Sequence, residues 1–356
     1  MDAVGLPEII AIMMVVSLNA YVITGGADFG GGAWDLLATG PRAGAQRALI
    51  AHELGPIWEA NHVWLIFVIV ILFTAFPPAF AALSTVLHIP LTIMLLGIVL
   101  RGSSFVFRSY GARDDLSQAR WGRVFAIAST VTPVILGVIV GAVVSGAAGE
   151  AANAARAYSL GTSVRAGPGF AAIYVTPWLA PFPLAVGAMA LAMFAFLAAV
   201  YLAFAAHDDQ LREDFRRRGL GAAAAMFAAA FSALAVARFS APEIARSLVG
   251  RETLAFQAAT AVAALMAIWA LWMRRWAVAR IAAAAQVSLI LWGWVLVQYP
   301  FVIPPTLTVR AAAAPRATLL LLFYAVLAGA ALLLPSLAYL YRTFARSSRE
   351  AMSRER

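Results

Sequence analysis

The chain has 356 residues, and its composition excludes an ordinary soluble protein. Hydrophobic residues make up 63% and charged residues 12% of the sequence, whereas soluble domains carry about 25% charged residues. The net charge of +9 comes from arginines that lie between apolar runs rather than in one patch, so we expect no nucleic-acid partner. Cysteine is absent, which excludes disulfides and thiolate ligands within the chain. These properties predict an integral membrane protein embedded in a lipid bilayer.

Nine apolar runs approach the length of about 20 residues that a bilayer requires. The expected spans are residues 8–28, 56–76, 79–100, 123–147, 180–206, 219–237, 256–273, 278–298 and 317–342. The predicted fold is an all-α transmembrane domain over residues 1–342, with two four-helix bundles and one peripheral helix. A division into halves 1–147 and 180–342 is expected, and a basic tail follows at 343–356.

Two connections between the expected spans carry strong local signals. Phe76-Pro77-Pro78 separates the second and third runs and predicts a tight reversal. Residues 208–218 form the densest run of charges and predict a solvated loop.

The distribution of arginines predicts the orientation of the chain. With nine spans the termini lie on opposite sides, and alternation places 19 arginines on one side and 7 on the other. The positive-inside rule then puts the C-terminus in the cytoplasm and the N-terminus outside. The start of the second span, which carries Glu59, faces the cytoplasm in this arrangement.

Glu59 and His62 are the most informative polar residues. They lie three residues apart, share one helix face and shortly precede the apolar run 65–73. Ionisable groups carried into a membrane are costly and are functional candidates by default. A carboxyl group among apolar neighbours near the cytoplasmic face is suited to accept and pass protons. The alternative is an acid that favours the helix N-terminus through the helix dipole.

The end of the first span carries two aspartates and five glycines between Thr24 and Asp35. Glycines at such a place permit neighbouring helices to approach closely. Asp28 and Asp35 are seven residues apart and share a face if the helix continues. Asp28 is a second proton-path candidate, and the alternative that both acids cap or terminate the helix stays open.

The histidines of the spans do not predict a metal site in this chain. Glu59 and His62 form one Glu-x-x-His pair, whereas a di-iron carboxylate site needs two such pairs and two further glutamates. Any histidine could ligate haem iron, and His88 is the best placed, but a helix-packing histidine is the simpler interpretation.

Arg101 and Arg108 are expected to snorkel to the membrane surface; the alternative is pairing with an acid of the first or second span.

Three segments together resemble subunit II of the cytochrome bd-type quinol oxidases. Residues 24–32 are similar to the family pattern Thr-Asp-Gly-Phe-Asp-x-Gly-x-Gly, and residues 56–65 to Pro-x-Trp-Asp/Glu-x-Asn-x-Val-Trp-Leu. The turn Tyr299-Pro300-Phe301-Val302-Ile303-Pro304 is also similar. The first segment departs from the pattern, because Gly25 stands in place of an acid and Ala27 in place of an aromatic residue.

The resemblance implies a haem-free subunit of a respiratory oxidase in the bacterial inner membrane, with a periplasmic N-terminus. The partner is expected to be a haem-bearing subunit I, and the complex is expected to oxidise quinol and reduce dioxygen to water. This chain then supports assembly and proton and oxygen access, and a bound quinone is left open.

The resemblance also assigns residues. Glu59 maps onto the family's proton-delivering acid, Asp28 onto its second acid and Trp64 onto the closing tryptophan, with a packing or oxygen-access role. His62 is a proton-path partner that could compensate for Gly25. Two alternatives stay open, a proton-coupled secondary transporter and a structural scaffold with no proton role.

Overall fold

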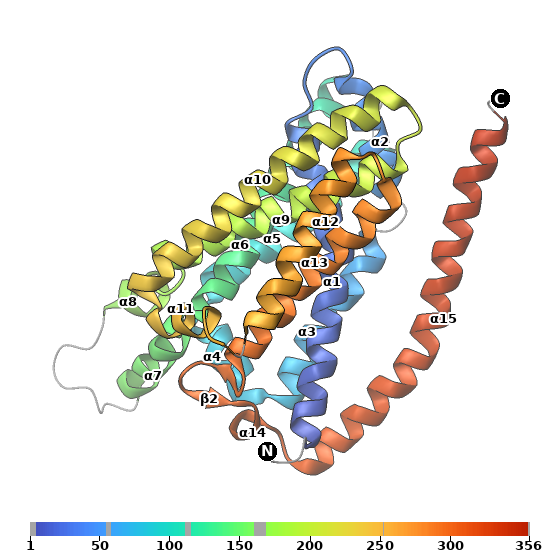
Figure 1. Ribbon diagram of the computed structural model, residues 1–356. Coiled ribbons are helices and arrows are strands. Elements are labelled where there is room, and N and C mark those ends of the chain that lie inside the picture. The colour runs from blue at the N-terminus through green and yellow to red at the C-terminus, as the bar shows by residue number, and fades with distance from the viewer. Residues whose placement is uncertain (1–4, 55–57, 111–114, 160–168, 252, 355–356) are drawn as a thin grey trace.

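The protein is almost entirely helical, as Figure 1 shows. The computed structural model describes residues 5–54, 58–110, 115–159, 169–251 and 253–354, without the side chains at 54, 58–59, 109–110, 115 and 340–354. The long helices are α1 (Leu6–Leu36), α3 (Trp58–Ala75), α5 (His88–Tyr110), α6 (Asp115–Val144), α9 (Pro181–Ala205), α10 (Asp209–Ser240), α12 (Leu254–Trp272), α13 (Trp276–Gln298) and α15 (Arg316–Arg354).

These helices confirm the predicted all-α membrane protein. Among the described residues, eight helices are long and apolar enough to cross a bilayer. The pair formed by α3 and the short helix α4 (Pro77–Val86) brings the number to nine if it counts as one span.

The tight reversal predicted at Phe76-Pro77-Pro78 is a sharp bend instead. The chain changes direction by 115° between α3 and α4, on either side of Phe76. Pro77, which lacks an amide hydrogen, is the first residue of α4. The chain then turns again into α5 at His88, nine residues beyond the expected start of the third span at residue 79. The α4 segment is therefore a separate helix and not the beginning of the third span.

The charged stretch 208–218 is helical, so the prediction of a solvated loop is wrong. The Asp208 carboxylate accepts hydrogen bonds of 2.8 Å from the backbone N–H groups of Gln210 and Leu211 and thereby caps α10. Within the first turns, Glu213 accepts from Arg216 at 2.8 Å and from Arg217 at 3.1 Å. A cap followed by opposite charges three and four residues apart favours a helix over a loop.

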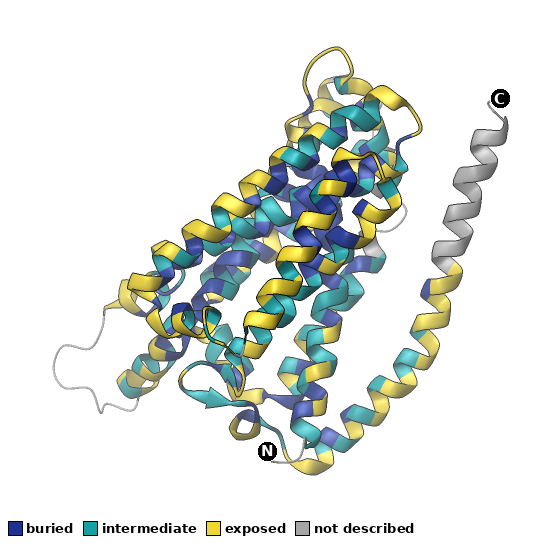
Figure 2. Ribbon diagram, viewed as in Figure 1, coloured by how far each residue is buried: buried dark blue, intermediate teal, exposed yellow. Residues whose placement is uncertain are grey.

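Helix α9 lies at the centre of the bundle and contacts α1, α6, α10 and α13. Most of its residues in the second half are fully buried (Figure 2). The glycines of α1 allow the close approach that the sequence predicts. A Cβ on Gly30 would overlap the backbone carbonyl of Phe194 in α9, and one on Gly32 would overlap Ser129 in α6.

Helix α15 stands to one side of the bundle in Figure 1 and is the predicted peripheral helix. Only 6% of its apolar window is buried inside the protein. It is attached near its start, where Leu319 joins a buried cluster with Ile10 of α1 and Ile71 of α3.

The short elements gather at the two ends of the bundle (Figure 1). Helix α2 (Ala43–Leu54) lies at one end. At the other end lie α4, α7 (Ala147–Ser159), α8 (Phe170–Tyr174), α11 (Pro242–Leu248), α14 (Val309–Ala312) and a small hairpin. The hairpin pairs β1 (Phe301–Ile303) with β2 (Leu307–Thr308), antiparallel.

An ion pair ties the start of α1 to the hairpin end. Arg310 of α14 donates to the Glu8 carboxylate at 2.6 Å, and the Glu8 side chain is 7% exposed. Helix α1 therefore begins at the hairpin end, while α15 runs from that end towards the α2 end (Figure 1).

Candidate functional site: a buried ion pair where three helices meet

The polar centre of the bundle is built around Asp28 of α1, which is 4% exposed. Asn61 of α3 donates from its side-chain amide to the Asp28 carboxylate at 2.6 Å. A guanidinium nitrogen of Arg101, from α5, lies 3.8 Å from the same carboxylate oxygen. Three separate helices therefore contribute one polar group each to the same buried place.

Arg101 is the least expected member of this group, because its side chain is 2% exposed. Its guanidinium carbon lies 4.9 Å from the centre of the Phe29 ring and 5.4 Å from that of Phe125, distances at which cation–π attraction operates. The expectation that Arg101 snorkels is wrong, because α5 continues for more than two turns beyond it. The alternative, pairing with an acid of the first span, is confirmed.

The site has hydrogen-bonding capacity beyond its ion pair. The Tyr21 hydroxyl, the Asn61 side-chain oxygen and the Arg101 Nε are buried and have no hydrogen-bond partner among the described residues. Buried polar atoms are in most cases bonded, to protein or to water. The centre therefore offers donors and acceptors next to Asp28 in a setting that is otherwise apolar.

A second ion pair lies seven residues further along both α1 and α5. Arg108 donates to both carboxylate oxygens of Asp35 at 3.3 Å, and the Asp35 side chain is 4% exposed. The two aspartates share a face of α1, as their spacing predicts. The alternative that Asp28 terminates the helix is wrong, because α1 continues to Leu36.

The remaining predicted residues lie on α3. His62 packs between the rings of Tyr21 and Phe29, with ring centres 6.1 and 6.3 Å away. Trp64 is partly buried and packs against the main hydrophobic core. Glu59 belongs to the first turn of α3, but its side chain lies outside the described part of the structure.

His88, the histidine best placed in the sequence to ligate haem iron, contacts groups of this chain. The His88 Nδ1 lies 2.9 Å from the backbone oxygen of Thr85, and its ring packs edge-on against Tyr174. This confirms the packing interpretation of His88. Among the described residues, no three His, Cys, Asp or Glu side chains come together as a metal-binding group.

Sequence reasoning gave Asn61 no role of its own and held the pairing of Arg101 with an acid of the first span only as an alternative. A signal for Arg101 was present, because Arg101 and Arg108 repeat the seven-residue spacing of Asp28 and Asp35. Asn61 had no such signal, since only the packing of α3 against α1 brings its amide to the carboxylate.

The fold and the site define a multi-span, all-α membrane protein whose early helices enclose a buried carboxylate–guanidinium pair. A family model described as cytochrome bd terminal oxidase subunit II matches residues 6–344. The chain belongs to this family.

Curated relatives match over shorter stretches. Cytochrome bd ubiquinol oxidase subunit 2 of Bacillus subtilis (strain 168) is 36% identical over 95 residues, which cover 26% of this chain and 28% of the relative. Cytochrome bd-I ubiquinol oxidase subunit 2 of Escherichia coli (strain K12) is 27% identical over 139 residues, which cover 38% of this chain and 35% of the relative. The chain thus aligns with about a third of the length of these relatives.

A solved structure extends the likeness to the whole fold. A chain of the bd oxidase from Geobacillus thermodenitrificans superposes with a TM-score of 0.75, covering 95% of this chain and 98% of the other. The sequences are 22% identical, so this match establishes a shared fold.

Proposed function

We propose that the protein is the haem-free subunit of a quinol oxidase complex that oxidises quinol and reduces dioxygen to water. Its partner in this proposal is a larger, haem-bearing subunit I. The chain supports assembly of the complex and carries protons towards the site of oxygen reduction. Family membership supports the complex, and the buried Asp28 centre supports the proton role.

The Asp28 centre is the single observation that carries the proton role. A carboxylate and a guanidinium are costly to bury, and polar groups inside a membrane commonly mark a substrate or proton path. Asp28, Asn61 and the Tyr21 hydroxyl bring proton-exchanging and hydrogen-bonding groups together inside the bundle. Glu59, two residues before Asn61 on α3, is the proposed entry from the surface, with His62 as its neighbour on the same helix face.

The haems belong to the partner in this proposal. Membership of the oxidase subunit II family supports that assignment, and no step of the proton role passes through a haem bound to this chain. Trp64, packed in the core, is assigned to packing or oxygen access. A quinone bound to this chain stays a prediction.

The proposed location is the bacterial inner membrane, with the α2 end of the bundle in the cytoplasm. The excess of arginines on that side supports this orientation. Protons for oxygen reduction are then taken up from the cytoplasm, which is the direction that charges the membrane. The secondary-transporter alternative is not supported, since the chain belongs to a family of oxidase subunits.

The first experiment is co-purification from native membranes through a tag on this chain. We expect a second large membrane subunit and a haem absorption spectrum in the purified material. If the chain is recovered alone and without haem absorption, the oxidase proposal is wrong.

The second experiment measures oxygen uptake by complexes that carry Glu59→Gln or Asp28→Asn. Both variants keep the size of the side chain and remove its exchangeable charge, so we expect uptake to fall by about tenfold or more. The haem content of each complex is measured alongside to exclude an assembly defect. Wild-type uptake in both variants, with full haem content, would favour the scaffold alternative.

A further inference from the structure

A groove with a volume of about 350 Å³ lies at the α2 end of the bundle, away from the Asp28 centre. It runs between the α1–α2 connection and the first turns of α10. The residues that line it are Thr39, Gly40, Pro41, Arg42, Gln46, Asp214, Arg217 and Arg218. Its walls thus carry three arginines and one carboxylate, and the proton role uses none of them.

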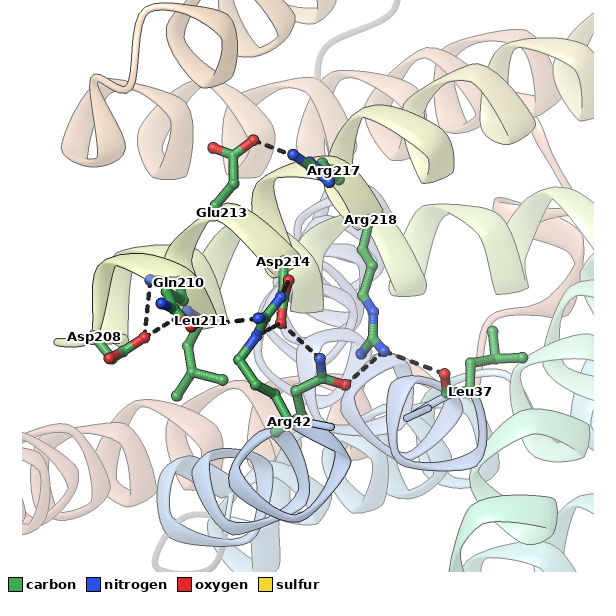
Figure 3. Close-up of polar contacts among 10 residues, drawn as sticks. Leu37, Arg42, Asp208, Gln210, Leu211, Glu213, Asp214, Arg217 and Arg218 are labelled. Carbon is green, nitrogen blue, oxygen red and sulfur yellow. Dashed lines mark hydrogen bonds and ion pairs between the residues drawn. The ribbon is translucent and has the colours of Figure 1, made fainter. Parts of the chain in front are cut away.

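The single carboxylate in the groove is already neutralised. Arg42 donates to both oxygens of Asp214, at 2.8 and 2.6 Å, and Gln46 adds a third hydrogen bond of 2.8 Å. Figure 3 shows Arg42, directly before α2, reaching across to Asp214 of α10. This contact fixes α2 against α10, and it leaves Arg217 and Arg218 as the two groove arginines whose hydrogen bonds go to groups other than Asp214.

Arg218 has no carboxylate as a direct hydrogen-bond partner among the described residues. One of its terminal nitrogens donates to two neutral oxygens, the backbone carbonyl of Leu37 at 3.2 Å and the Gln46 side chain at 2.7 Å. The other terminal nitrogen is buried and has no hydrogen-bond partner in the described part of the chain. The guanidinium is held in place by the Trp34 ring, 5.3 Å away.

Arg217 adds a second, more accessible cation, with a side chain that is 76% exposed. It donates to Glu213 at 3.1 Å, but the same carboxylate also serves Arg216 at 2.8 Å and Arg274 at 3.4 Å. Three guanidinium groups therefore share one negative charge on this side of the groove.

The backbone on the opposite wall is open. Gly40 has a φ of +80°, a left-handed conformation that favours glycine, and a Cβ there would meet no atom within 4 Å. Gly40, Pro41 and Arg42 of this wall lead directly into α2, whose N-terminus carries a partial positive charge.

We propose that this groove binds a phosphate group, with Arg217 and Arg218 as its charge partners and Thr39 as a hydroxyl donor. The headgroup of an anionic phospholipid is the favoured source, because the apolar side chains of Leu36 and Leu37, 43% and 57% exposed, lie three and two residues before Thr39 in the sequence. Basic pockets at the cytoplasmic ends of membrane helices bind such headgroups. The proposal does not rest on the oxidase assignment.

The test uses the protein purified with its partner subunits and stripped of lipid in an uncharged detergent. Dihexanoyl phosphatidylglycerol, dihexanoyl phosphatidylcholine and inorganic phosphate are titrated separately, and the thermal unfolding midpoint is followed. Two variants are compared with the wild type, Thr39→Asp, which adds a carboxylate to the groove, and Thr39→Asn, its uncharged isostere. Thr39 is exposed and lines the groove, so neither change disturbs the core.

We expect phosphatidylglycerol to raise the midpoint of the wild type and of Thr39→Asn, and phosphatidylcholine to have a much smaller effect. Thr39→Asp should bind phosphatidylglycerol roughly fivefold or more weakly, the factor that corresponds to one charge at a membrane surface. An equal response to inorganic phosphate supports the site with a soluble phosphate as its source. Equal responses of Thr39→Asp and Thr39→Asn to phosphatidylglycerol and to inorganic phosphate would overturn the proposal.

Discussion

Asp28 and Arg101 place two opposite charges in the interior of the bundle. Their side chains are 5% and 2% exposed, and the closest nitrogen and oxygen are 3.8 Å apart. Removing one member of a buried pair leaves the other charge without compensation and costs about 3–5 kcal/mol, whereas an exposed pair contributes about 0–1 kcal/mol. The two residues should therefore affect stability as a unit.

Replacement of Arg101 by glutamine is expected to lower the free energy of unfolding by about 3–5 kcal/mol, because the Asp28 charge would stay buried without its partner. The double variant Asp28→Asn, Arg101→Gln should regain much of that loss, since neither charge remains. Thermal unfolding of the detergent-purified complex measures both effects.

The matched control is Arg246→Gln. Arg246 pairs with Glu243 at 3.7 Å, but both side chains are largely exposed, at 75% and 87%. We expect a change of less than about 1 kcal/mol in this variant. Losses of similar size at Arg101 and Arg246, or a double variant no better than Arg101→Gln, would contradict the account of the buried pair.

Gly25 marks the departure from the family pattern, and the structure supplies a physical reason for it. A Cβ on Gly25 would lie 3.0 Å from the ring of Tyr21, one turn earlier on α1. Tyr21 is 1% exposed and fills the space that a larger side chain at position 25 would need. The ring of Tyr21, which carries a buried hydroxyl, therefore occupies the space beside Gly25.

At the scale of helices, the contact between α1 and α9 depends on one missing side chain. Because a Cβ on Gly30 would overlap the Phe194 carbonyl, Gly30→Ala is expected to push the two helices apart. Overpacking of this kind costs about 1–3 kcal/mol. We expect a lower unfolding midpoint and a lower yield of assembled complex.

Gly221→Ala serves as the control for this prediction. Gly221 lies on an exposed face of α10, and a Cβ there meets no atom within 4 Å. Alanine favours the helix over glycine by up to about 1 kcal/mol, so this variant should be neutral or slightly more stable. A Gly30→Ala protein as stable as Gly221→Ala would show that the helices adjust without cost.

The sequence predicted which segments form helices more accurately than it predicted where those helices begin and end. Apolar runs locate the spans because a bilayer demands them, but hydropathy does not detect polar residues that continue a helix. Thus α1 runs eight residues past the expected end at residue 28, and α10 begins ten residues before the expected start at 219. Polar residues can continue α1 because a buried ion pair compensates the charge at its end. They can begin α10 because ion pairs form within its first turns.

At the scale of the whole molecule, alternation of the spans assigns each loop to one of two sides. Single cysteines introduced at Ser159 and Ser247, both exposed near the hairpin end, should be labelled from outside the cell by a membrane-impermeant maleimide. A cysteine at Asp209, 96% exposed at the start of α10, should be labelled only after the membrane is opened. The natural chain has no cysteine, so within this chain only the introduced cysteine can react with the maleimide.

Each labelling result bears on the proposed orientation. Labelling of all three positions from the same side would show that the alternation is wrong. The reverse pattern would show that the spans alternate but that the α2 end faces outward.

The site was predictable in part. Asp28, His62 and Glu59 were identified because ionisable groups beside apolar runs are unusual, and this pattern can be recognised from the sequence alone. The pairing of Arg101 with an acid of the first or second span was held only as an alternative, because such a contact joins residues that are far apart in the sequence and depends on how α1 and α5 sit in the bundle. The division into halves 1–147 and 180–342 stays a prediction.

The ion pair between Glu8 and Arg310 has a consequence for the timing of assembly. The two residues are 302 positions apart, and chains are synthesised at about 5–20 residues per second, so roughly 15–60 s separate their appearance. During that interval Glu8 has no Arg310 to bind, so this contact between α1 and the hairpin end is not yet made. The first helix to enter the membrane must therefore wait for nearly the last, and a chain that stops before Arg310 would leave that end open to quality control.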